Sequence, residues 1–391
     1  MISSKPPLTD ESATPSLQHN YAQKYGARLR IVKVNGIDIE VAEAGDSSNP
    51  MVLLLHGWPE TWGSWRWQFD HLSHLGFYVV APSTRGYGFS HAPDDPKAYG
   101  IKILADDAVG LVHELGHHTA QIVGHDWGAI CAWHFALMRP EIFTSVFCLS
   151  VPLGWSVDGE AVIPRLESST LTPMAALRKQ YGSGFFYIIY HNQIDGEGNP
   201  FSGPADREYE RNPEKLHDGL MQNYVSNFKS GSVKYKVKMI FSGLKIALKM
   251  RHSVGGMLER LPIFVDVPDW IDSSDRSFWL NQFSASGFLG GLNYYRNLDE
   301  NYKNTADLEG KVVMQPTGFL YGSQDIVITH LVEKNWLIDM KRFAPQLKDE
   351  YITQVNGGSH WIMAERPNEV NKALESFLLA HRQDKNMSKT S

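Results

Sequence analysis

The sequence predicts an α/β protein with a doubly wound, mostly parallel sheet and an inserted helical domain. Continuous apolar runs, of which MVLLL at 51–55 is the clearest, are typical of parallel strands that are buried on both faces. Helix-like stretches alternate with such runs as far as Pro152. The alternation stops over about residues 153–300 and resumes after residue 301, which indicates one core interrupted by a helical insert.

The N-terminal part begins with a segment, residues 1–25, that is rich in Ser, Pro and Thr and poor in apolar residues. We therefore expect a flexible tail there. Two β-like runs follow, and the Asn35–Gly36 pair between them predicts a hairpin. These runs open the first part of the α/β core, which we expect over residues 26–152.

The rest of the core is predicted from apolar runs and helical periodicity. The further strands are expected at 77–82, 120–124, 145–152, 317–322 and 351–355. Apolar residues at helical spacing predict helices at 61–76, 101–116 and 127–138. We expect the insert, residues 153–300, to be a helical cap that is rich in aromatic residues. The second part of the core is then expected at 301–382 and a C-terminal tail at 383–391.

The composition is that of an ordinary globular protein. The chain has 391 residues, of which 42% are hydrophobic and 20% charged, and a net charge of -6, so a general nucleic-acid binder is not expected. Cys131 and Cys148 lie in apolar surroundings and are predicted to be buried thiols of a reducing compartment. We expect a cytoplasmic protein, a monomer or homodimer, without a metal or organic cofactor.

The stretch VGHDWGA has the glycine spacing of a nucleophile elbow, with Asp126 at its centre between Gly124 and Gly128. A β-like run precedes it and a helix-like run follows. This context predicts that the Asp126 side chain projects above the carboxyl end of a strand, where ligands bind in open α/β sheets. The alternative is an aspartate that only caps the following helix.

Other segments supply the partners that such an elbow needs. The His56–Gly57–Trp58 turn follows a strand, and it can aim the Trp58 N–H at an oxyanion together with the Trp127 N–H. Asp325 and His360 each follow a late strand. The chain order of nucleophile, acid and histidine is the order found in α/β-hydrolases, so we predict a triad of Asp126, Asp325 and His360.

With these motifs the chain resembles the epoxide hydrolase group of the α/β-hydrolase family over about residues 28–382. The resemblance is carried by HGWPE (56–60), TRGYG (84–88), GHDWGA (124–129), SQD (323–325), SHW (359–361) and LNYYRN (292–297). One departure is Ser83, where such proteins often carry Asp. The resemblance implies hydrolysis of a lipophilic epoxide to a vicinal diol.

The aspartate at the elbow favours displacement at saturated carbon. Asp126 needs no base to attack, and it would form an alkyl ester whose carbonyl belongs to the enzyme. His360 would then activate water to hydrolyse that ester, oriented by Asp325. The substrate is therefore an epoxide or an alkyl halide.

The leaving group separates these two substrates, because an opened epoxide needs O–H donors whereas a halide needs N–H donors. The resemblance implies two donor tyrosines in the cap. Tyr295 matches one of them, and Tyr187 is chosen for the other, with Tyr190 one helical turn later as the alternative. We expect the substrate pocket to include His56, Pro59, Tyr190, Tyr294 and Trp361, with Tyr294 turned towards the packing side of its helix.

Other interpretations remain open at this point. A haloalkane-type dehalogenase would keep Asp126 and His360 and use Trp127, with Trp270 or Trp279 as a cap donor. A non-catalytic binding protein on the same fold would have no need of His360. The basic segment Lys229–Arg251 could contact an anionic membrane, but a solvated face of cap helices is the favoured interpretation.

Overall fold

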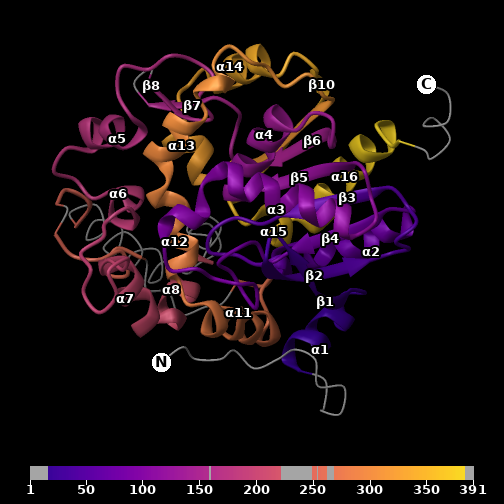
Figure 1. Ribbon diagram of the computed structural model, residues 1–391, viewed down its shortest axis with the longest axis horizontal. Helices are drawn as coiled ribbons and strands as arrows, with labels where there is room; N and C mark the ends of the chain where they lie inside the picture. The colour runs from indigo at the N-terminus through magenta and orange to yellow at the C-terminus, as the bar shows by residue number, and fades with distance from the viewer. Residues whose placement is uncertain (1–15, 158–159, 222–248, 253, 262–267, 384–391) are drawn as a thin grey trace, which may run out of the picture.

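The computed structural model describes residues 16–157, 160–221, 249–252, 254–261 and 268–383. Within these residues, eight strands form one sheet in the order β1-β2-β4-β3-β5-β6-β9-β10 (Figure 1). Its strands are β1 (Arg28–Val34), β2 (Ile37–Ala44), β3 (Met51–Leu55), β4 (Tyr78–Pro82), β5 (Ala120–His125), β6 (Phe143–Leu149), β9 (Thr317–Gly322) and β10 (Leu347–Val355). β2 runs antiparallel to β1 and β4, and the other neighbours are parallel. The predicted mostly parallel sheet is confirmed.

The hairpin between β1 and β2 turns at the predicted dipeptide. Asn35 has a φ of 49° and Gly36 a φ of 75°. Two successive residues with positive φ are the geometry of the two-residue turn that matches the twist of a hairpin, and Asn-Gly adopts it most readily.

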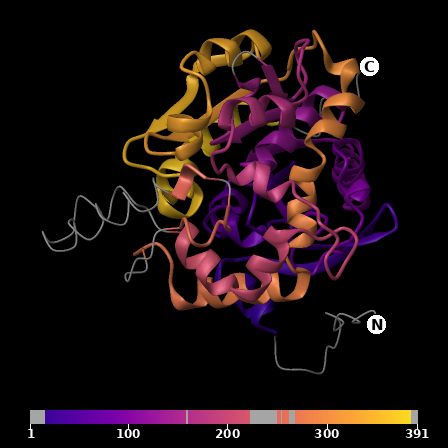
Figure 2. The same ribbon diagram turned by 90° about the vertical axis from the view of Figure 1, so that its left-hand side faces the viewer.

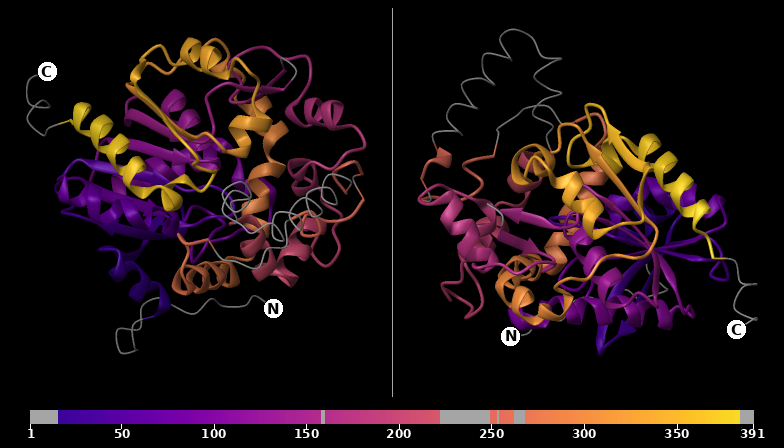
Figure 3. Two further views of the ribbon diagram at one scale, coloured as in Figure 1. Left: turned by 180° about the vertical axis from the view of Figure 1, so that it is seen from behind. Right: turned by 90° about the horizontal axis from the view of Figure 1, so that it is seen from above.

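The sheet is buried on both faces, as its continuous apolar strands require. Met51, Leu53 and Leu55 of β3 join the cluster that packs under α3 (Ile101–Glu114) and α4 (Trp127–Met138). The alternate residues Val52 and Leu54 join the cluster of the opposite face. That face is covered by α2 (Arg66–His74), α15 (Ile362–Glu365) and α16 (Pro367–Ala380). Figure 1 shows α3 and α4 in front of the sheet. The left panel of Figure 3, which views the molecule from behind, shows α16 on the opposite face.

The insert between β6 and β9 covers one end of the sheet (Figures 1 and 2). Its elements are β7 (Trp155–Val157), β8 (Glu160–Ile163), α5 (Pro173–Tyr181), α6 (Tyr187–His191), α7 (Pro204–Arg211), α8 (Pro213–Leu220), α11 (Ser273–Ser286), α12 (Leu289–Arg296) and α13 (Leu298–Asn304). The expected end of the cap at residue 300 falls inside α13. Shorter helices at Trp62–Trp65, Pro96–Tyr99 and Ala306–Leu308, and α14 (Trp336–Phe343), complete the described elements.

The prediction of a flexible tail through residue 25 is wrong for residues 17–25. Leu17–Lys24 form helix α1, which packs against β1 and α11. The Tyr21 ring stacks on Phe278 with centroids 4.0 Å apart, and its hydroxyl donates to Asp275 at 2.6 Å. Local composition could not reveal this helix, because its partners on α11 lie about 250 residues further along the chain. Residues 1–15 lie outside the described part.

Three further expectations concern compartment and surfaces. Among the described residues, none of the helices combines the length and the apolar character that a membrane span requires. Cys131 and Cys148 are free and buried, as predicted. The basic segment Lys229–Arg251 lies outside the described residues except for its last three.

Candidate active site

Asp126 occupies the sharp turn between β5 and α4 with φ 52° and ψ −117°. The two glycines of the motif make this turn possible. A Cβ on Gly124 would lie 2.2 Å from the Gly128 carbonyl oxygen, and a Cβ on Gly128 would lie 2.1 Å from that of Leu55. Because neither position can hold a side chain, the motif's spacing is required by the close approach of β3, β5 and α4.

The three residues of the predicted triad come together at the carboxyl ends of β5, β9 and β10. His360 Nδ1 lies 3.0 Å from Asp325 Oδ1, and His360 Nε2 lies 3.6 Å from Asp126 Oδ2. The Asp325 side chain is fully buried and also accepts the Val327 N–H at 2.9 Å. His360 therefore bridges two carboxylates.

The charges of Asp126, His360 and Asp325 stabilise one another. Burial alone would raise the pKa of Asp126, but the hydrogen bond and charge of His360 outweigh it and hold that pKa below its ordinary value. Burial likewise disfavours a charged His360, yet the carboxylates of Asp325 and Asp126 raise its pKa well above the ordinary value. In the unliganded protein, the two carboxylates therefore favour the protonated form of His360.

The predicted oxyanion donors lie beside Asp126. The Trp58 N–H donates to Asp126 Oδ1 at 2.8 Å. A Cβ on Gly57 would lie 2.4 Å from the Asp126 Cβ, so only glycine lets this turn approach so closely. Trp127 is the first residue of α4, and the N–H groups of a first helical turn have no partner within the helix. The Trp58 N–H thus contacts a carboxyl oxygen of Asp126, and the Trp127 N–H needs an acceptor from outside the helix.

Two buried residues that the sequence reasoning missed hold this arrangement in place. The Glu60 carboxylate accepts the Gly57 N–H at 2.6 Å and pairs with His125 Nδ1 at 3.0 Å. His125 Nε2 in turn lies 2.9 Å from the His360 carbonyl oxygen. Both residues stand inside the motifs HGWPE and GHDWGA, and their polar side chains in these short glycine-containing turns were the available signal.

Tyr187 and Tyr295 face the same cavity as Asp126. This cavity has a volume of about 370 Å³ and is lined by Asp126, Trp127, Ile130, Val151, Trp155, Tyr187, Ile188, Tyr295, Leu298, Val327 and Leu331. The two tyrosine rings lie 6.1 Å apart between centroids, at an angle of 81°. Burial raises the pKa of both hydroxyls above the ordinary value, so both keep their protons and can donate. The remaining wall is apolar.

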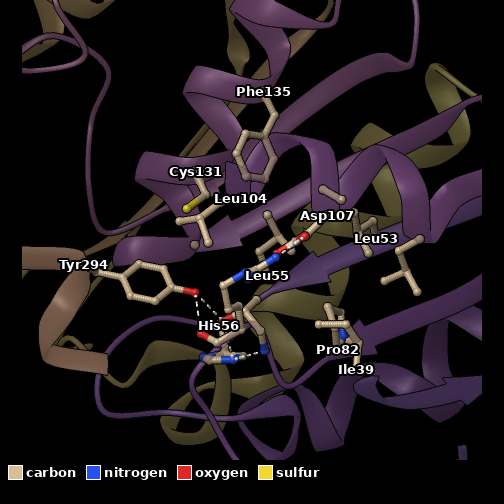
Figure 4. Close-up of a pocket in the computed structure, with 15 residues that line it drawn as sticks. Ile39, Leu53, Leu55, His56, Pro82, Leu104, Asp107, Cys131, Phe135 and Tyr294 are labelled. Atoms are coloured by element: carbon tan, nitrogen blue, oxygen red, sulfur yellow. Dashed lines mark hydrogen bonds and ion pairs between the residues drawn. The ribbon is translucent and has the colours of Figure 1, made fainter. Parts of the chain in front are cut away.

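His56 and Tyr294 lie next to a second cavity, of about 490 Å³, between the sheet, α3 and α4 (Figure 4). The Tyr294 hydroxyl lies 3.1 Å from Thr84 Oγ1 and donates to the Arg85 carbonyl at 3.0 Å. Burial lowers the pKa of His56 to about 4, so its Nε2 is free to accept the Thr84 N–H at 3.0 Å. These contacts anchor α12 and the His56 turn to the core.

The other residues expected in the substrate pocket make contacts elsewhere. The Tyr190 hydroxyl donates to Glu208 at 3.1 Å. The Pro59 carbonyl accepts the Trp279 indole N–H at 2.8 Å, and the Trp361 indole N–H donates to the Leu220 carbonyl at 2.7 Å. Of these three residues, none lines the Asp126 cavity as described.

Comparisons of sequence and of structure with known proteins agree on the same kind of relative. Residues 50–172 match the family described as alpha/beta hydrolase fold. Over 351 residues the chain is 34% identical to epoxide hydrolase A of Mycobacterium tuberculosis. This alignment covers 89% of this chain and 96% of that protein. The crystal structure of epoxide hydrolase A from Mycobacterium thermoresistibile aligns with a TM-score of 0.75 at 32% identity, over 90% of this chain and 98% of that one. An epoxide hydrolase from an endophytic Streptomyces aligns with a TM-score of 0.74 at 30% identity, over 91% and 96% of the two chains.

Proposed function

The chain belongs to the epoxide hydrolases of the α/β-hydrolase family, and from this premise we propose that it opens an epoxide through a covalent ester on Asp126. The product is a vicinal diol. The observation that carries the proposal is that Asp126, Tyr187 and Tyr295 line one and the same cavity. Its apolar walls suit a lipophilic substituent on the epoxide.

The first step is displacement at an epoxide carbon. A carboxylate oxygen of Asp126 forms the new C–O bond while the epoxide C–O bond breaks, and that bond's electron pair goes to the epoxide oxygen. Tyr187 and Tyr295 donate hydrogen bonds to this oxygen, and one of them supplies its proton. The depressed pKa of Asp126, caused chiefly by His360 against the effect of burial, keeps the nucleophile ionised.

The second step is hydrolysis of the ester. His360 takes a proton from water, and the resulting hydroxide attacks the carbonyl carbon of Asp126. The N–H groups of Trp58 and Trp127 stabilise the oxyanion, and its collapse releases the diol and restores the carboxylate. The tyrosine that gave up its proton in the first step regains one from His360, so that the cycle leaves both groups as they began. Asp325 orients His360 through the 3.0 Å contact to Nδ1.

The dehalogenase alternative requires N–H donors for a halide in the cap. Trp279 gives its indole N–H to the Pro59 carbonyl, and Trp270 and Trp279 line a different cavity beside Arg66. Trp155 of the cap lines the Asp126 cavity, but its indole N–H donates to the Leu331 carbonyl at 2.9 Å. The other polar cap residues in that lining are Tyr187 and Tyr295, which favours an epoxide. A purely binding protein is disfavoured as well, because it has no need of a histidine held between two carboxylates.

Oxygen-18 labelling tests the ester mechanism. In a single turnover in labelled water, the diol should carry unlabelled oxygen from Asp126, and the enzyme should acquire label at Asp126 over repeated turnovers. In His360→Gln, mass spectrometry should detect a substrate adduct on Asp126. A first-turnover diol that carries solvent label, or full turnover by Asp126→Asn under conditions that prevent deamidation, contradicts the mechanism.

A further inference from the structure

The helices that carry the two tyrosines are tied together at their carboxyl ends. Tyr187 begins α6 and Tyr295 lies near the end of α12, and the two helices lie close together in Figure 1. The Asn192 side-chain amide, one residue beyond α6, donates to the Tyr295 carbonyl at 2.9 Å. The Arg296 guanidinium, next to Tyr295, donates to the Gln193 carbonyl at 3.1 Å. Both bonds join the segment that directly follows α6 to the end of α12 at Tyr295 and Arg296.

Arg296 is itself held by a buried ion pair. Its Nη2 donates to Asp206 of α7 at 2.7 Å, and the two side chains are 1% and 2% exposed. Its Nη1 donates to the Phe201 carbonyl at 3.1 Å and to Asn293 at 3.0 Å. One guanidinium therefore contacts α12, α7 and the segment that follows α6.

This ion pair is a costly way to stabilise a fold. Within the described residues, Arg296 Nε and Asp206 Oδ1 are buried without a hydrogen-bond partner. A buried pair repays its desolvation only when its geometry and hydrogen bonds are nearly complete, and apolar residues of similar volume are often as stable. The planar guanidinium of Arg296, with its N–H donors in a fixed fork, instead fixes the geometry between the elements that it joins.

We propose that Asn192, Asp206 and Arg296 form a clamp that sets the position of Tyr295 relative to Tyr187, and that Arg296 is a positioning residue for epoxide opening. The inference rests on the proposed function, because the clamp acts only through the tyrosines. Both hydroxyls must reach one epoxide oxygen, and a displacement of about 1 Å in such a constellation can cost about 100-fold in rate.

Arg296→Lys tests the clamp, because lysine keeps the charge but loses the fork. Single-turnover kinetics should show ester formation slowed by roughly 10- to 100-fold, while ester hydrolysis changes by less than about 2-fold. Arg66→Lys is the matched control, since Arg66 and Asp275 form a buried pair with 6% and 10% exposure that contacts neither tyrosine. It should lower the melting temperature without slowing ester formation.

The same substitution in a variant that lacks both tyrosine hydroxyls distinguishes a positioning role from a general loss of structure. In Tyr187→Phe/Tyr295→Phe, Arg296→Lys should change ester formation by less than about 2-fold, because there is no donor left to misplace. The clamp is refuted if the folded Arg296→Lys forms ester at the wild-type rate, slows both steps equally, or loses as much rate without the tyrosines as with them.

A milder variant covers the case in which Arg296→Lys does not fold. Asn192→Ala removes only the bond to the Tyr295 carbonyl and should slow ester formation in the same selective manner. An unchanged rate of ester formation in this variant also overturns the proposal. Failure of the underlying function is distinguishable, since the wild-type enzyme would then form no ester on Asp126 at all.

Discussion

Replacing Tyr295 by phenylalanine isolates the contribution of one hydroxyl to epoxide opening. The Tyr295 ring packs edge-on against Trp127 and Trp58, with centroids 5.1 and 5.9 Å away. Phenylalanine keeps these ring contacts, so the change removes a donor and little else. Because burial raises the pKa of the Tyr295 hydroxyl well above the ordinary value, the wild-type group is protonated at every pH at which the enzyme is assayed.

The size of the effect follows from the charge on the oxygen that the hydroxyl contacts. A hydrogen bond to a charged group contributes about 1.5–3 kcal/mol, which corresponds to roughly 10- to 150-fold in rate. Tyr187→Phe should fall in the same range, because Tyr187 faces the same cavity. The double variant should lose more than either single variant, since the opening oxygen then has no donor. In the proposed mechanism, hydrolysis of the ester depends on His360 and the oxyanion donors, so its rate should be unaffected.

Stopped-flow tryptophan fluorescence provides the assay, because Trp127 lines the cavity and the Trp58 indole lies against Tyr295. Single turnovers resolve formation of the ester from its decay. Tyr302→Phe is the control, because the buried hydroxyl of Tyr302 has no hydrogen-bond partner among the described residues. The reasoning is refuted if Tyr295→Phe slows decay of the ester and leaves its formation unchanged.

Three further predictions follow from particular contacts. Folding raises the pKa of His360 because its two carboxylate partners outweigh burial, so its contribution to stability is fully present below the unfolded pKa and is lost as the pH rises through the folded value. The free energy of unfolding of wild type, measured by urea denaturation, should therefore approach that of His360→Gln as the pH rises above neutrality, and a constant difference contradicts this. Trp155→Ala should extend the apolar end of the cavity and shift kcat/KM in competition assays by about 10-fold towards epoxides with bulkier substituents, whereas Trp155→Phe should shift it less. Gly128→Ala should lower the free energy of unfolding by about 1–3 kcal/mol or more, because the new Cβ would lie 2.1 Å from the Leu55 carbonyl oxygen. Gly100→Ala, whose Cβ would have its nearest neighbour at 4.0 Å, should be tolerated, and equal losses in the two variants would disprove the steric argument.

The core was predictable from sequence because its signals are local. Strand β3 is apolar at every position, and the structure uses alternate residues on opposite faces of the sheet. The hairpin at Asn35 and Gly36 likewise depends on the backbone preferences of two adjacent residues. Helix α1 was missed for the opposite reason, since what orders it is a contact with α11 across the fold.

Pocket residues were harder to predict because closeness in sequence does not give the direction of a side chain. Tyr294 and Tyr295 are neighbours on α12, yet successive helical residues point about 100° apart. Tyr295 faces Asp126, whereas Tyr294 faces the cavity beside His56. Single-sequence patterns also give no signal for Asn192, because its role depends on which carbonyl happens to lie opposite.

The contacts of Asp126 also link the two proposed steps through the pKa of His360. While Asp126 is a carboxylate, it and Asp325 raise the pKa of His360 against the effect of burial, which favours the protonated imidazole over the free base. Ester formation removes the negative charge of Asp126 and leaves Asp325 as the remaining carboxylate partner, which lowers the pKa of His360. Consumption of the nucleophile in the proposed first step therefore shifts His360 towards the free base. An aspartate at the elbow thus does more than change the electrophile, because the loss of its charge on ester formation favours the form of His360 that the proposed second step needs.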